Sequence, residues 1–174
     1  MMKRFLTSAF LLVTFFVLQG TLFQTLNFAN TSPNLLIILI VSLALMKGEE
    51  TGVILGFFAG ILTDIFTGSA IGLYALIYMY LGYANGSFHR IFFPEDVKLP
   101  MIMIIVSDIF YGILVYILLF LLRGKTDFSY YFTNVILPEA IYTIVVTILL
   151  YPLILWINKM LEKDEQRKAK KFVS

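Results

Sequence analysis

The chain has 174 residues, of which 60% are hydrophobic and 14% are charged, and its formal net charge is +2. Soluble domains are closer to one half apolar and one quarter charged, so this composition excludes an ordinary soluble globular protein and indicates a chain solvated by lipid. The lack of cysteine excludes disulfides, thiolate metal sites and a cysteine nucleophile. The apolar runs are continuous rather than alternating, which favours helices over a β-barrel.

Six apolar runs follow one another, and each is expected to form a membrane-spanning helix, for which about 20 residues are needed. The first run lacks a small-x-small cleavage site, so we expect an uncleaved helix. Polar loops are expected at 85–98 and 123–134, and Pro138 and Pro152 are expected to break the last helix. The sequence predicts an all-α transmembrane domain over residues 1–157 and a basic cytoplasmic tail at 158–174, with helices over 5–23, 34–46, 51–66, 70–84, 99–122 and 135–157.

The basic residues predict the orientation of these helices. If the N-terminus is cytoplasmic, only Arg123 and Lys125 of the 13 lysines and arginines fall on the outer side, which leaves 11 on the cytoplasmic side. This bias obeys the positive-inside rule, so we expect a multi-pass protein with both termini in the cytoplasm. The tail is expected to be a topology anchor, and an amphipathic helix lying on anionic lipid is the alternative.

Glycines recur every four residues through the third run and the turn after it. Residues four apart share one helix face, so the glycines form a ridge almost free of side chains that ends at Asp64. Such a ridge lets another helix approach closely. We expect it to pack inside the bundle; a contact with a partner or in a homodimer is the alternative. The positions assigned to helix packing or partner binding are Gly52, Gly56, Gly60, Asp64, Gly68 and Gly72.

Three acidic residues interrupt the apolar runs, and a charged carboxylate at mid-bilayer costs roughly 2.5–3.5 kcal/mol on insertion scales. Asp64 is expected near the outer end of its helix, close to water, as a structural polar residue; a catalytic or ligand-binding role is the alternative. Glu139 follows Pro138 and is expected in a first helical turn, where the helix dipole favours an anion. Asp108 is expected to be deep, and we predict that Asp108 and Glu139 are buried polar residues of the bundle.

The sequence contains no convincing catalytic constellation. Two intramembrane aspartates, Asp64 and Asp108, are what an aspartyl protease would use, but their expected depths differ. His89 is the only histidine, and it is expected to be a solvated loop residue. We find no phosphate-binding loop, no Ser–His pair and no metal cluster. We therefore predict a chain that is not an enzyme, with no catalytic residue, metal, cofactor or nucleic-acid partner.

The third and fourth runs contain the spacing Gly-x3-Asp-x3-Gly-Ser-x-x-Gly-x-x-Ala-Leu. This spacing resembles the signature of the rod shape-determining protein MreD family. The chain length, the uncleaved first helix, the six spans and the short basic tail resemble that family over the whole chain. The residues that carry the signature are Gly60, Asp64, Gly68, Ser69, Gly72, Ala75 and Leu76.

The resemblance implies a non-enzymatic scaffold of the cell-wall elongation machinery in the bacterial cytoplasmic membrane. It implies binding to the bitopic protein MreC and, indirectly, work beside the actin-like MreB, RodA and a class B penicillin-binding transpeptidase. The family is similar in fold to the substrate-binding subunits of energy-coupling-factor transporters. The alternative function is therefore a vitamin-type uptake subunit. Such subunits often carry Ala-x3-Ala on the first helix, whereas here Ala9 is followed by Val13.

Overall fold

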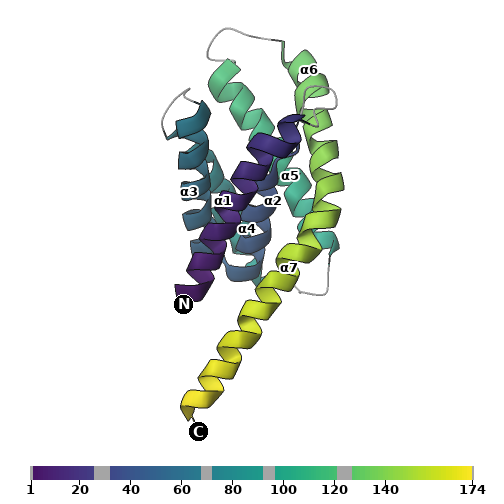
Figure 1. The fold of residues 1–174 in the computed structure, drawn as a ribbon. Helices are drawn as coiled ribbons and strands as arrows, with labels where there is room; N and C mark the ends of the chain where they lie inside the picture. The colour runs from purple at the N-terminus through teal and green to yellow at the C-terminus, as the bar shows by residue number, and fades with distance from the viewer. Residues whose placement is uncertain (1, 26–31, 68–71, 92–96, 121–126, 174) are drawn as a thin grey trace.

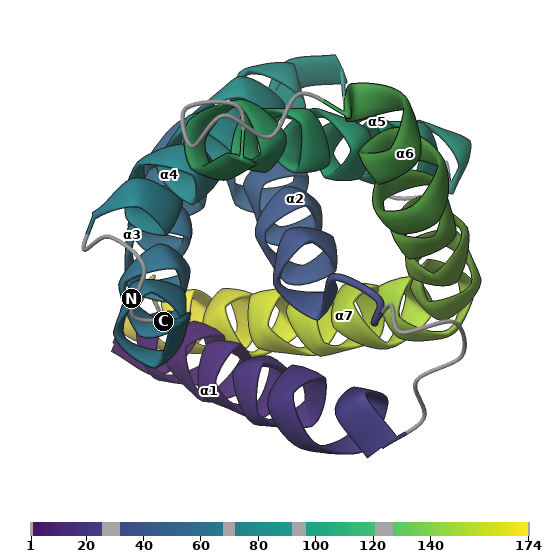
Figure 2. The ribbon, with the colours of Figure 1, turned by 90° about the horizontal axis from the view of Figure 1, so that it is seen from above.

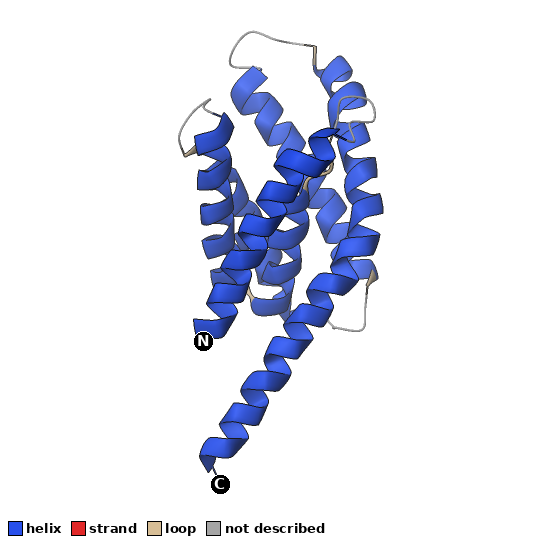
Figure 3. Ribbon diagram, viewed as in Figure 1, coloured by secondary structure: helices blue, strands red, loops and turns tan. Residues whose placement is uncertain are grey.

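The computed structural model of the chain describes residues 2–25, 32–67, 72–91, 97–120 and 127–173 (Figure 1). Within these ranges every regular element is helical (Figure 3). Three helical segments are long and apolar enough to cross a membrane, at Glu49–Thr67, Lys98–Leu119 and Phe128–Leu161. The α-helices are α1 (Met2–Thr25), α2 (Leu35–Lys47), α3 (Glu49–Thr67), α4 (Leu73–Gly86), α5 (Lys98–Val115), α6 (Phe128–Tyr131) and α7 (Leu137–Val173).

Helix α2 is the centre of the bundle, and the other long helices surround it (Figure 2). Its residues from Leu35 to Met46 are all buried, and all but Ser42 are hydrophobic. A helix that is apolar on every side has no face for water, so either lipid or other helices must surround it. The continuous apolar composition of this segment is compatible with its central position, and the packing of the other helices around it supplies the cover.

Helix α2 has 13 residues, or about 20 Å of length, which is less than the roughly 30 Å of a hydrocarbon core. Protein atoms satisfy the backbone N–H groups of its first turn. The Asn34 Oδ1 accepts from the Ile37 N–H at 3.3 Å, and the Gln19 Oε1 accepts from the Leu36 N–H at 3.2 Å. Non-helical backbone at membrane depth is tolerated where protein surrounds it, which explains how so short a helix fits.

The final helix differs from its predicted form in length and continuity. The segments α6, a π-helical segment over Phe132–Ile136 and α7 follow one another directly, so helical backbone runs from Phe128 to Val173. Pro138 cannot donate a backbone hydrogen bond, and a π register is one way for a helix to pass such a position. The predicted break at Pro152 is wrong, because this proline lies inside α7.

Two segments predicted as polar loops are partly helical. The segment 128–134 is helical, and Ser87–Ile91 forms a 3₁₀ helix that directly follows α4. The tail from residue 158 to 173 continues α7 and extends beyond the bundle on the side where α1 begins (Figure 1). The tail is therefore helical and points away from the bundle.

Candidate functional site

The glycine ridge of α3 packs against α4 of the same chain. A β-carbon added at any of its three helical glycines would overlap backbone atoms of α4, because the two helices are in backbone contact. The opposing pairs are Gly52 with Gly82, Gly56 with Tyr78, and Gly60 with Ala75. A partner helix or a second copy of the chain could reach the ridge only by displacing α4. In this structure the ridge therefore builds the fold and is not an open docking surface.

Two glycines of α4, which the sequence analysis did not select, complete this contact. A β-carbon at Gly82 would overlap the backbone of Gly52, and one at Gly86 would overlap the backbone of Glu49. Gly82 and Gly86 repeat the four-residue spacing of the ridge, and this repeat is the signal that could have revealed them. Each helix thus presents glycines to the other, which explains why the backbones of α3 and α4 are in contact.

Asp64 caps the start of α4. Its Oδ2 accepts from the N–H groups of Gly72 at 2.9 Å and Ala75 at 3.2 Å, and its Oδ1 accepts from the Tyr74 N–H at 3.0 Å. Residue Gly72 occupies the N-cap position and has no side chain, so Asp64 supplies the missing acceptor from the neighbouring helix. The negative carboxylate also lies where the dipole of α4 favours it.

The surroundings of Asp64 differ from the expectation of nearby water. Its side chain is only 1% exposed, and its oxygens lie against the backbone at the start of α4. Gly72 has φ of +97°, a backbone conformation that favours glycine. The predicted site residue Gly68 lies outside the described residues. Both oxygens of the carboxylate accept from backbone donors at the start of α4, so Asp64 links the two helices.

A second polar cluster joins α2, α4, α5 and α7 in the interior. The backbone N–H of Asn34 donates to the Thr143 Oγ1 at 3.1 Å, and its Nδ2 donates to the Glu139 Oε1 at 3.5 Å. The Tyr78 hydroxyl donates to the Asn34 Oδ1 at 3.5 Å. The ring of Tyr78 is stacked on that of Tyr111, with centroids 5.2 Å apart and planes 8° from parallel. These contacts connect four helices at the N-terminal end of α2.

Asp108 belongs to the same cluster. Its side chain is 3% exposed, and it interacts electrostatically with Glu139, which is half-buried. Among the described residues, neither carboxyl oxygen of Asp108 has a hydrogen-bond partner of ordinary geometry, although the Thr143 side chain lies beside it. No lysine or arginine occurs in residues 99–122 or 135–157 to pair with these acids. A carboxyl group in this setting is costly to bury in its charged form.

The expected setting of Glu139 is corrected by the structure. It lies in the first turn of α7, but helical backbone precedes that turn from Phe128 onward, so no free helix N-terminus faces the carboxylate. A different group, the Asn34 amide, provides its hydrogen bond. The acidic neighbour of Asp108 is Glu139, while Asp64 is occupied by the backbone of α4. The structure thus does not bring Asp64 and Asp108 together as a protease pair would require.

Within the described ranges, no group of three or more histidine, cysteine or acidic side chains could hold a metal ion. His89 lies in the 3₁₀ helix after α4, where its Nδ1 donates to the Leu45 carbonyl at 2.6 Å. Although His89 is exposed, it is therefore anchored to the end of α2 and is not simply a solvated loop residue. The sequence contained no signal for this contact, because the two residues are 44 positions apart.

A family model described as the rod shape-determining protein MreD matches residues 2–163 of the 174-residue chain. The chain belongs to the MreD family. No curated protein and no solved structure matches it. The similarity to energy-coupling-factor subunits therefore remains a prediction. The residues of the glycine contact and of the interior cluster lie within the matched range. MreD is a shape-determining family that is not known as enzymatic, and its apolar helices here indicate a membrane protein.

Proposed function

We propose that this MreD-family chain is a non-enzymatic scaffold that holds the membrane helix of an MreC-like bitopic partner in the bacterial cytoplasmic membrane. The observation that carries the proposal is the family match over residues 2–163, which covers α1 to α6 and α7 as far as residue 163. Through the partner, the scaffold would act beside MreB, RodA and a class B penicillin-binding transpeptidase in cell-wall elongation. Rod shape would then depend on contact between the scaffold and its partner and not on turnover of a substrate.

The proposed topology has six passes with both termini in the cytoplasm. The start of α1 and the end of α7 lie at the same end of the bundle (Figure 1). Arg123 and Lys125, the two basic residues predicted outside, lie between α5 and α6, whose adjoining ends are at the opposite end of the bundle. Both features support the positive-inside orientation.

The interior of the bundle supports a scaffold rather than an enzyme. The ridge is covered by α4, and both oxygens of Asp64 accept from backbone N–H groups at the start of α4. The partner helix is therefore expected on the outer surface, where the exposed side chains of α1, α5 and α7 are largely apolar. In lipid such a contact depends on packing, because lipid tails solvate apolar side chains equally well.

The proposal is tested by complementation of rod shape in a strain depleted of its MreD protein, together with co-purification of the MreC-like partner. We expect the chain to restore rods and to bring down the partner from detergent-solubilised membranes. Single photo-crosslinking residues at exposed positions of α1, α5 and α7 would identify the contact face. Restored rods without any partner contact in either assay would refute the scaffold mechanism while leaving the family assignment intact.

A further inference from the structure

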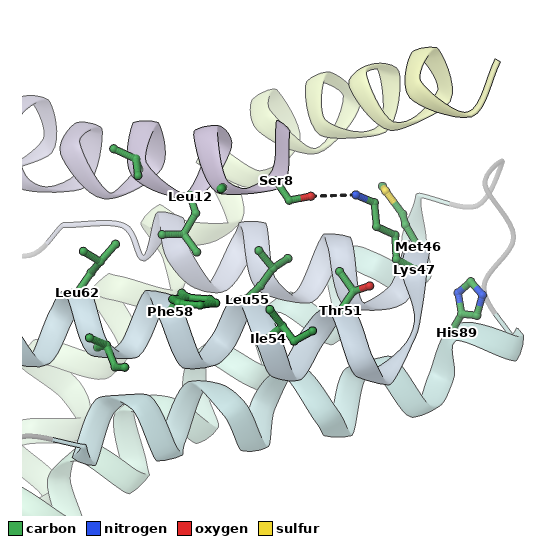
Figure 4. A pocket seen from close by; sticks show the side chains of 13 residues that line it. Ser8, Leu12, Met46, Lys47, Thr51, Ile54, Leu55, Phe58, Leu62 and His89 are labelled. Atoms are coloured by element: carbon green, nitrogen blue, oxygen red, sulfur yellow. Dashed lines mark hydrogen bonds between the residues drawn. The ribbon is translucent and has the colours of Figure 1, made fainter. Parts of the chain in front are cut away.

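A groove of about 570 Å³ lies between α1 and α3, away from the interior cluster (Figure 4). This volume lies in the range of small-molecule binding sites. Its walls are apolar along most of their length, with Leu12 and Val13 from α1 and Leu55, Phe58 and Leu62 from α3. Val13 is 53% and Phe58 is 49% exposed, so the groove is open on the side that faces the bilayer.

One end of the groove is polar and basic. Lys47, the last residue of α2, donates from its Nζ to the Ser8 Oγ at 3.0 Å. His89 lies at the same end, and its Nδ1 is occupied by the Leu45 carbonyl (Figure 4). Among the described residues, none of those that line the groove is acidic. The groove thus combines a cationic end with a long aliphatic and aromatic channel.

We propose that this groove binds an anionic diacyl phospholipid, with its phosphate at Lys47, Ser8 and His89 and one acyl chain along α3. The polarity of the groove changes along its length in the same order as the polarity of a phospholipid. Basic pockets between membrane helices on the cytoplasmic side are typical sites for anionic headgroups. The polar end lies on the side where α1 begins, which is the inner leaflet in the proposed topology (Figure 1).

The groove fits an acyl chain better than a partner helix. Close contact between membrane helices relies on small residues that let the backbones approach. Along the apolar walls only Ala9 is small, and Ile54, Phe58 and Leu62 project as bulky side chains. A flexible acyl chain can follow such an uneven surface, whereas a rigid helix cannot. The lipid site is therefore distinct from the partner contact of the proposed function. The lipid proposal can be refuted while the scaffold proposal stands.

The test is native mass spectrometry of the full chain released from nanodiscs that contain phosphatidylglycerol and phosphatidylcholine with identical acyl chains. We expect a bound phosphatidylglycerol to survive release preferentially. Lys47→Gln should weaken its retention about fivefold, as expected for one basic residue at a membrane surface, and Lys47→Arg should restore it. Lys159→Gln is the matched control, because it removes the same charge from an exposed position of α7 that does not line the groove.

The apolar part of the site is tested separately. Ala9→Phe should fill the groove and reduce retention of both lipids, while Val17→Phe adds the same ring to an exposed position of α1 outside it. Equal retention of the two lipids by the unmodified chain would overturn the proposal. So would an equal loss in Lys47→Gln and Lys159→Gln. A photo-crosslinker at Val13 that captures a protein helix instead of phospholipid would show that the groove is a partner site.

Discussion

Gly60→Ala tests whether contact between α3 and α4 holds the bundle together. The new β-carbon would overlap the backbone of Ala75, and backbone cannot rotate aside as a side chain can. Overpacking typically costs 1–3 kcal/mol, so we expect about 3 kcal/mol here, at the upper end. Alanine regains about 1 kcal/mol through its higher helix propensity. The net loss in the free energy of unfolding is therefore about 2 kcal/mol.

Gly20→Ala is the matched control for this substitution. Gly20 is a helical glycine of α1, and a β-carbon there would meet no atom within 4 Å. Only the propensity term remains, so this variant should be more stable by about 1 kcal/mol. The two alanine variants should thus differ by about 3 kcal/mol, with opposite signs relative to the unmodified chain. Reversible unfolding in mixed micelles, followed by circular dichroism, measures both free energies.

A neutral Gly60→Ala would refute the reasoning, because it would mean that α3 and α4 separate in lipid without cost. Gly112→Ala should have an effect on the free energy of unfolding between those of Gly60→Ala and Gly20→Ala. Its β-carbon would meet the Ile136 side chain at 2.9 Å, and a side chain can shift. We therefore expect a loss smaller than that of Gly60→Ala.

Three further predictions concern the acidic residues and the topology. Asp64→Asn replaces one accepting oxygen with a donor that faces a backbone N–H, so it should lose about 1–3 kcal/mol in the same unfolding assay; a variant as stable as the unmodified chain would refute the cap. Asp108→Leu removes a carboxyl group whose oxygens have no ordinary partner among the described residues. It should change stability by less than about 1 kcal/mol and keep rod shape in complementation, so loss of rods at a normal protein level would give that carboxyl a functional role. A cysteine at Ser129 should react with an impermeant thiol reagent on intact cells and one at Ser174 only after permeabilisation; the reverse pattern would exclude the proposed orientation.

The apolar runs alone predicted the positions of α1, α2 and α3 to within a few residues, because exclusion from water acts on continuous stretches of sequence. The bounds and the continuity of the last helix were not predictable in this way. Polar residues at 128–134 and charged residues after 157 suggest a loop and a tail, yet backbone hydrogen bonds continue through both in the structure. Pro152 likewise reads as a break although neighbouring residues keep the helix continuous.

The sequence by itself determined that the chain is a helical membrane protein, and it located the glycines and the acidic residues that shape the bundle. Only the tertiary structure decided what each of them contacts. Asp64 caps α4 across a turn, and Asp108 has Glu139 as its neighbour and not Asp64. Periodicity identifies which face of a helix a residue occupies but contains no information about which other helix covers that face. That choice depends on how all the helices pack around α2 at once.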